Sequence, residues 1–122
     1  MELKFAEHAT VDSDRLVELC IRMGESRAEE MISSSIEELW SGLEELRSAY
    51  AQQRLSVVQE QAAQMADIAD HLGLYLFAKV SRDVKNCAAG GDGTSLAACM
   101  CRLHRLADST INSVWDLCDI SS

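Results

Sequence analysis

The chain has 122 residues, with 20 acidic and 11 basic side chains and a formal net charge of −9. This length suits one domain with one core, so we expect residues 1–122 to form a single domain. The excess of carboxylates and the lack of a basic cluster argue against nucleic acid and against an anionic membrane surface as partners. No apolar run approaches the roughly 20 residues of a membrane-spanning helix, and residues 1–10 lack the apolar core of a secretory signal. We therefore expect a cytoplasmic protein.

Strong helix formers dominate the composition, and the chain contains no proline. Long stretches rich in Ala, Leu, Glu, Gln and Met predict an all-α fold. We expect the first ten residues, which include His8, to be loosely held. The first predicted helix begins at Asp12 or Ser13 and ends at Gly24.

A long second helix is predicted from the next capping signal to about Tyr50. Ser26 and Glu29 have the spacing of a capping box, which typically opens a helix. Glutamates separate the apolar residues, which recur at helical spacing and should face the core: Met31, Ile32, Ile36, Leu39, Trp40, Leu43, Leu46 and Tyr50.

The third predicted helix carries the most regular apolar pattern of the chain. Its apolar residues follow 3-4-3-4-3 spacing, which is typical of a seam in a helical bundle: Leu55, Val58, Ala62, Met65, Ala69 and Leu72. We place on the opposite, solvent-facing side Ser56, Glu60, Ala63, Asp67 and Asp70. This periodicity alone predicts that Ala63 is exposed near the middle of the helix.

Two further helices complete the expected fold, and glycines separate them. A fourth helix is predicted from about Leu74 to Ala89, with inward-facing residues Phe77, Val80, Val84 and Cys87. No strand precedes the glycines at 90–93, so we interpret them as a helix–helix connection and not as a phosphate-binding loop. Thr94 or Ser95 should cap the last helix, whose apolar side comprises Leu96, Cys99, Leu103, Leu106, Val114 and Leu117. The predicted architecture is an antiparallel four-helix bundle with one or two additional short N-terminal helices.

The five cysteines are an odd number, which fits free thiols in a reducing compartment better than a disulfide framework. Cys99, Cys101 and His104 have a spacing that could suggest a metal site. Residues two apart on a helix point roughly 200° apart, so Cys99 and Cys101 cannot share one metal ion without unwinding. We therefore expect no metal and no cofactor, and we interpret these cysteines as small apolar residues and His104 as a residue at the edge of the core.

The run from Gln61 to Gly73 resembles the signature of histidine phosphotransfer (HPt) domains, which reads approximately His-x-Leu-Lys-Gly-x-Ala-x-x-x-Gly. Ala69 and Gly73 match that pattern, and Ala63 stands at the position of the phosphoacceptor histidine. The likeness extends from about Asp12 to Leu117, through the expected helix ends and the run Gly73-Leu74-Tyr75-Leu76-Phe77-Ala78. The resemblance implies the helical-bundle fold of that family.

Three departures from the family pattern remove its chemistry. Ala63 replaces the histidine, Ala66 replaces the lysine that would neutralise phosphoryl oxygens, and Asp67 replaces a glycine that leaves room for a partner. The resemblance then implies a phosphorelay-type binding module without enzymatic activity, whose partner is a receiver-like or histidine-kinase-associated domain. The face that would make this contact comprises Gln59, Ala63, Gln64, Ala66, Asp67 and Asp70.

Two other functions remain open at the level of sequence. His71 also projects away from the apolar seam, so the chain could be an active phosphotransfer protein that uses this imidazole. The simpler interpretation of His71 is a residue that interacts favourably with the carbonyl end of its helix. The third alternative is a structural helical subunit that self-associates through its long helices.

Overall fold

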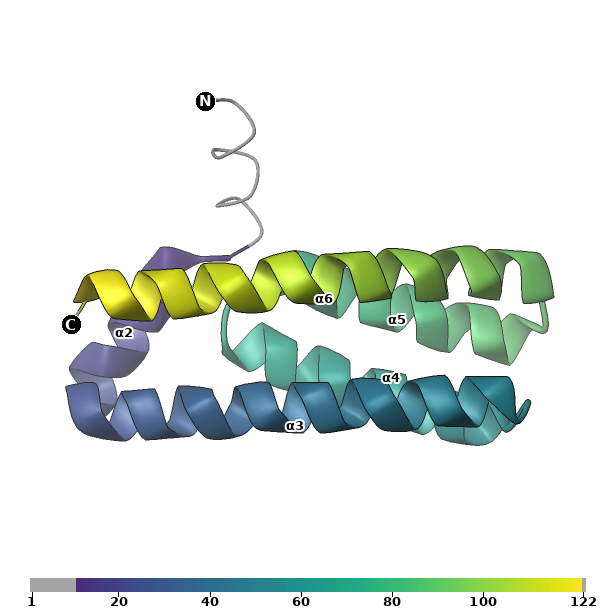
Figure 1. The fold of residues 1–122 in the computed structure, drawn as a ribbon, viewed down its shortest axis with the longest axis horizontal. Coiled ribbons are helices and arrows are strands. Elements are labelled where there is room, and N and C mark those ends of the chain that lie inside the picture. Colours follow the sequence, from purple (N-terminus) through teal and green to yellow (C-terminus); the bar gives the residue numbers. More distant parts are fainter. Residues whose placement is uncertain (1–10, 122) are drawn as a thin grey trace, which may run out of the picture.

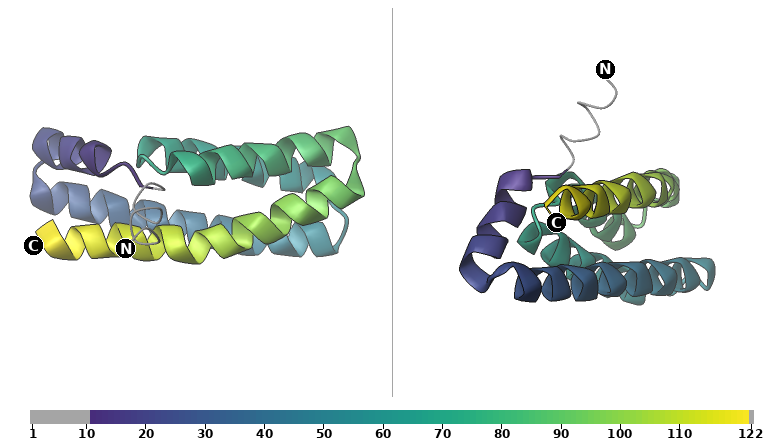
Figure 2. Two further views of the ribbon diagram at one scale, coloured as in Figure 1. Left: turned by 90° about the horizontal axis from the view of Figure 1, so that it is seen from above. Right: turned by 60° about the vertical axis from the view of Figure 1, so that its left-hand side comes forward.

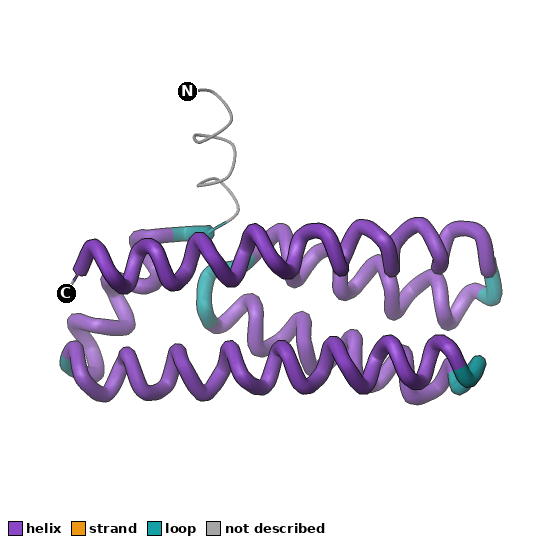
Figure 3. Tube along the Cα trace, viewed as in Figure 1, coloured by secondary structure: helices purple, strands orange, loops and turns teal. Residues whose placement is uncertain are grey.

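The computed structural model describes residues 11–121, and side chains for residues 11–116. Within this range it contains five α-helices and no strand, which confirms the all-α prediction (Figure 1). They are α2 (Ser13–Met23), α3 (Glu25–Ala51), α4 (Leu55–His71), α5 (Tyr75–Gly90) and α6 (Gly93–Ser121). Short turns connect them (Figure 3). The expectation for residues 1–10 lies outside the described residues.

Helices α3 to α6 run along the long axis of the molecule, and successive helices point in opposite directions (Figures 1 and 2). The largest interface joins α4 to α5, followed by α3 with α4 and α5 with α6, while α3 and α6 barely touch. At 1.5 Å per residue the 27 residues of α3 span about 40 Å, whereas the 17 residues of α4 span about 25 Å. The 11-residue α2 lies obliquely at the end that the shorter α4–α5 hairpin leaves free (Figure 2).

The apolar seam predicted on α4 is confirmed. Leu55 is half-buried, and at most 1% of each remaining residue is exposed: Val58, Ala62, Met65, Ala69 and Leu72. On α3, Gly42 faces this seam, and a Cβ added there would lie 3.0 Å from Cγ of Met65. The missing side chain at Gly42 therefore lets α3 approach α4 closely.

The apolar stripe predicted on α3 is correct except at Trp40, which is 41% exposed. Leu39 and Leu43 fill the inward positions next to it and are buried. Trp40 is rotated by about 100° from Leu39, so it lies at the edge of the stripe. The helix buries three small residues that the apolar pattern did not include, Ala28, Gly42 and Ala49.

The ends of α2 agree with the prediction, but the start of α3 does not. Asp12 caps α2, because its Oδ1 accepts hydrogen bonds from the backbone N–H groups of Asp14 at 3.1 Å and Arg15 at 3.3 Å. Gly24 ends α2 with φ +84°. The predicted capping box of Ser26 and Glu29 is wrong, because α3 begins directly after Gly24 and no side chain caps it. With a single residue between the two helices, Ser26 already lies inside the first turn.

The predicted cap of α6 is also wrong, because the helix begins at Gly93 and Asp92 caps it. Oδ1 of Asp92 accepts the Ser95 N–H at 3.1 Å, and Oδ2 accepts the Ser95 hydroxyl at 2.8 Å. These two hydrogen bonds lower the pKa of Asp92. One carboxylate accepts both donors of Ser95, so it caps the helix better than a hydroxyl two or three residues later would.

The apolar side of α6 is confirmed as far as its side chains are described. Leu96, Leu103 and Val114 are buried, Cys99 and Leu106 are half-buried, and the side chain of Leu117 lies outside the described range. The helix also buries Met100, Ala107 and Ile111, which widen the stripe. Among the described helices, none has an apolar stretch long enough to cross a membrane.

Replacing Met65 with Asp should place an unpaired carboxylate at the centre of the seam, where 1% of Met65 is exposed. We expect the free energy of unfolding to fall by about 3–5 kcal/mol, as for other uncompensated buried charges. Urea denaturation followed by circular dichroism measures this loss. The matched control is Gln64→Asp at the exposed neighbouring position, which should change stability little. Equal stability of the two variants would show that the seam is misassigned.

Candidate functional site

Ala63 lies on the flank of α4, beside its buried seam and not opposite it. Counting about 100° per residue, Ala63 is about 100° from Ala62, which is fully buried. The side chains of Ala63 and Asp70 are half-buried, and Asp67, about 140° from Ala62, is exposed. The prediction of a solvent-exposed Ala63 is therefore too strong. The methyl group reaches the surface at the margin of a helix interface.

Ala66 does not belong to the surface, and its assignment to a partner-binding face is wrong. Only 1% of the residue is exposed, and it is part of the continuous apolar core. Position 66 is rotated by only about 40° from Ala62, so it shares the buried side of the helix. A docking protein could not touch Ala66 without opening the core.

Arg82 of α5 lies on the same flank as the two aspartates of α4. Its Nη2 atom is 2.6 Å from Oδ2 of Asp70 and 3.5 Å from Oδ1 of Asp67. The hydrogen bond to Asp70 is the main cause that raises the pKa of Arg82. Exposed pairs of this kind typically contribute between 0 and about 1 kcal/mol, so this one chiefly orients the three side chains.

We call the surface formed by Ala63, Asp67, Asp70 and Arg82 the α4–α5 face. Its charged groups are two carboxylates and one guanidinium, so it is less acidic than the α4 sequence alone suggests. Sequence analysis missed Arg82. The signal that could have found it is the helical hairpin turning at Gly73, which brings α5 alongside the aspartates of α4.

The other side of α4 faces α3 and carries the uncharged side chains of Gln61 and Gln64. Gln61 Nε2 donates a hydrogen bond of 2.6 Å to Oε2 of Glu45. Gln64 lines a shallow groove of about 210 Å³ between the two helices, together with Glu38 and Ser41. Gln64 is thus separated from the α4–α5 face, while Gln59, about 60° from Ala62, is half-buried on the same flank as Asp70. The six residues predicted as one contact surface do not form one.

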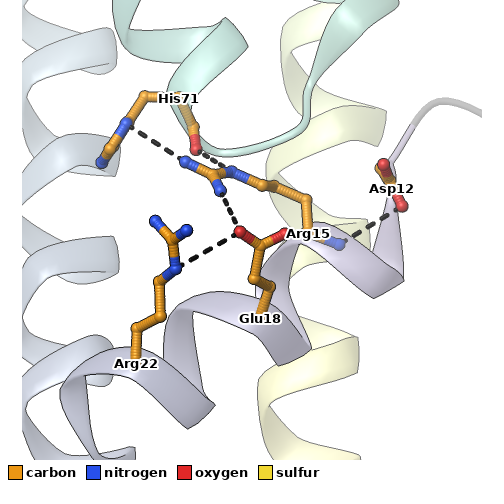
Figure 4. A network of polar contacts seen from close by, with 5 residues as sticks. All are labelled: Asp12, Arg15, Glu18, Arg22 and His71. Carbon is orange, nitrogen blue, oxygen red and sulfur yellow. Dashed lines mark hydrogen bonds and ion pairs between the residues drawn. The ribbon is translucent and has the colours of Figure 1, made fainter.

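His71 is exposed at the last residue of α4, where it meets an arginine of α2 (Figure 4). Arg15 Nε donates a 2.9 Å hydrogen bond to the His71 carbonyl, and Arg15 Nη2 lies 3.5 Å from His71 Nδ1. Glu18 Oε1 accepts from Arg15 Nη1 at 3.1 Å and lies 3.5 Å from Arg22 Nε. Arg15 therefore satisfies the last carbonyl of α4, and the imidazole lies beside a guanidinium.

Gly73 and the start of α2 form a close contact next to this network. The backbone N–H of Asp12 donates to the Gly73 carbonyl at 3.0 Å. Gly73 has φ +81°, and a Cβ added to it would lie 2.8 Å from Cβ of Arg15 and 3.1 Å from Cβ of Asp12. Only glycine adopts this positive φ without strain and also leaves room for α2 to pack this close to the turn.

Cys99, Cys101 and His104 do not converge. Cys99 is half-buried against Cys87 of α5, whereas Cys101 is exposed. His104 Nδ1 lies 2.8 Å from the Met100 carbonyl of its own helix, and its side chain is half-buried at the core margin. In the part of the chain that the structure describes, no three His, Cys, Asp or Glu side chains are grouped to hold a metal ion.

Comparison of the chain with protein-family models, with curated proteins and with solved structures finds no match. The likeness to phosphotransfer domains therefore rests on the residues of the chain itself. Those residues are the Gln61–Gly73 run and the helix ends around it.

Gly73→Ala should destabilise the protein more than Gly91→Ala. Both glycines have positive φ, +81° and +74°, so each alanine carries backbone strain of about 1–2 kcal/mol. Only at Gly73 does the new Cβ also collide with α2, since nothing lies within 4 Å of a Cβ at Gly91. Urea denaturation of both variants separates the collision from the strain. Equal losses would show that α2 does not pack on this turn.

Proposed function

We propose that this chain is a non-enzymatic binding module resembling a histidine phosphotransfer domain, and that it docks a receiver-like or kinase-associated domain through the α4–α5 face. The observation that carries the proposal is the methyl group of Ala63 at the family's phosphoacceptor position, half-buried on the flank of α4. A methyl group has no lone pair with which to attack a phosphoryl group.

The arrangement of the helices supports this proposal. α3 to α6 alternate in direction and pack in chain order, as expected for an antiparallel bundle of the phosphotransfer type. The α4–α5 interface is the largest, so the flank that carries Ala63 belongs to the most extensively packed helix pair. A surface whose residues lie on two packed helices, and not on a loop, loses less conformational freedom when a partner binds.

The charges of the face indicate how a partner would recognise it. Asp70 and Asp67 already share Arg82, so a partner with a strongly basic surface must compete with an internal guanidinium. The outer Asp67, whose side chain is 82% exposed and 3.5 Å from Arg82, is the freer of the two carboxylates. Electrostatic complementarity should therefore act mainly through Asp67 and mainly on the rate of association.

A second candidate function is phosphotransfer by His71, and the position of Arg15 favours it. A phosphorylated imidazole needs a nearby cation to offset the added negative charge. The Arg15 guanidinium lies 3.5 Å from His71 Nδ1, and the histidine is exposed. Against this function, Arg15 is already paired with Glu18.

Ala63→Arg should abolish docking, because a long charged side chain would stand where the partner approaches a methyl group. The control is Ser34→Arg, which adds the same side chain at an exposed position of α3. Affinity capture from an extract of the native host, read by mass spectrometry, should recover receiver-domain proteins with the wild type and Ser34→Arg but not with Ala63→Arg. Equal capture of receiver domains by the wild type, Ser34→Arg and Ala63→Arg would exclude this face.

Asp67→Lys should slow the association of the partner more at low salt than at high salt, because salt screens the electrostatic interaction that the substitution changes.

The wild type should accept no phosphate from a phosphorylated receiver domain, since Ala63 cannot be a nucleophile. Radiolabelled phosphate is followed through acid and alkali treatment, because phosphohistidine is labile to acid and stable to alkali. Ala63→His serves as the comparison that restores an imidazole on the proposed face and should become labelled. A label on the wild type that disappears in His71→Ala would instead establish His71 as the acceptor.

A further inference from the structure

Two thiols meet across the interface between α5 and α6. Cys87 lies in the last turn of α5 and Cys99 in the second turn of α6, and their Sγ atoms are 3.8 Å apart. Both side chains are half-buried. Of the other cysteines with described side chains, Cys20 is on α2 and Cys101 is exposed, and neither has a sulfur neighbour of this kind within the described residues.

We propose that Cys87 and Cys99 form a reversible intrachain disulfide, which makes this pair a modification site that links α5 to α6. The two sulfurs must approach by roughly 1.8 Å to reach the about 2.04 Å of a disulfide bond. Rotation of two side chains and a small shift of the helix hairpin supply such a movement. The inference stands independently of whether the α4–α5 face docks a receiver domain.

The connection between the two helices leaves room for this shift. It consists of Gly91 and Asp92, between Gly90 at the end of α5 and Gly93 at the start of α6, and a Cβ added at any of the three glycines would meet nothing within 4 Å. These glycines therefore have no close neighbours that a small change of the helix hairpin would disturb. Twelve positions separate the two cysteines, so the cross-link closes a short loop and lowers the entropy of the unfolded chain.

The environment of the pair assigns the order of the chemical steps. Burial raises the pKa of the Cys99 thiol, and the hydrogen bond with Cys87 raises it further, which disfavours Cys99 as the first nucleophile. We therefore assign the first attack to Cys87, which gives up its proton to solvent and attacks one sulfur of a low-molecular-weight disulfide such as oxidised glutathione. This step forms a mixed disulfide and releases one glutathione thiolate, which takes up a proton.

Cys99 then loses its proton to solvent and attacks the Cys87 sulfur of the mixed disulfide. The Cys87–Cys99 bond forms, and a second glutathione thiolate leaves and is protonated. The two protein thiols have together given up two electrons and two protons, and one oxidised glutathione has become two reduced molecules. An excess of reduced dithiol reverses both steps.

The test uses the full chain with Cys20, Cys101 and Cys118 replaced by serine, so that Cys87 and Cys99 are the only thiols. The control retains Cys87 and Cys101 and carries Cys20→Ser, Cys99→Ser and Cys118→Ser. Both proteins are treated with oxidised glutathione, and remaining thiols are blocked by alkylation. Proteolytic cleavage before Asp92 separates the two segments of the chain unless a disulfide joins them.

We expect the Cys87/Cys99 protein to form no disulfide between chains, to lose the mass of two hydrogen atoms per chain and to yield one disulfide-linked peptide pair. Its melting temperature should rise on oxidation and return to the starting value with dithiothreitol. The control should stop at the mixed disulfide with glutathione. Persistence of both free thiols, a stable mixed disulfide on the Cys87/Cys99 protein, or equal cross-linking of the control would overturn the proposal.

Discussion

The close contact at Gly73 is the constraint on which the arrangement of the helices depends. This residue turns the chain from α4 into α5 with φ +81°, and it also leaves room for the start of α2, whose Arg15 Cβ would be 2.8 Å from an added Cβ. One glycine therefore sets the direction of the largest helix interface and seats the shortest helix. The hydrogen bonds from Asp12 to the Gly73 carbonyl and from Arg15 to the His71 carbonyl complete this joint.

Sequence periodicity predicted the buried residues correctly where one repeating apolar pattern runs along a helix. The seam of α4 combines large and small apolar residues at regular spacing, so burial followed from the helical period alone. The predicted helix caps were wrong, because a single local contact decides which residue caps a helix. Asp92 outcompetes Thr94 and Ser95 because one carboxylate accepts two hydrogen bonds from Ser95, and Ser26 cannot cap a helix that starts one residue after Gly24.

The candidate site was harder to predict because it depends on neighbouring helices. The angle of Ala63 on α4 is fixed by the sequence, but how much of it is covered depends on the helices packed beside that flank. Ala66 is a different case, because its position only about 40° from Ala62 already places it on the buried side of α4, and its assignment to the surface came from the family resemblance. Arg82 lies on a different helix, twelve residues after Asp70, and its guanidinium offsets part of the negative charge of the face. No pattern within α4 predicts this contact.

The hydrogen bonds between α2 and the α4–α5 turn also have a consequence for the order in which the helices pack during folding. Arg15 and His71 are 56 residues apart in sequence, whereas the α4–α5 hairpin joins segments separated by one short turn. Loop closure favours the local hairpin first, because long-range contacts carry the larger entropic cost. The contact of α2 with this turn needs the Gly73 conformation first, so we expect it to form after the α4–α5 hairpin and to open before it. The packing of α2 on α3, by contrast, joins neighbours in sequence.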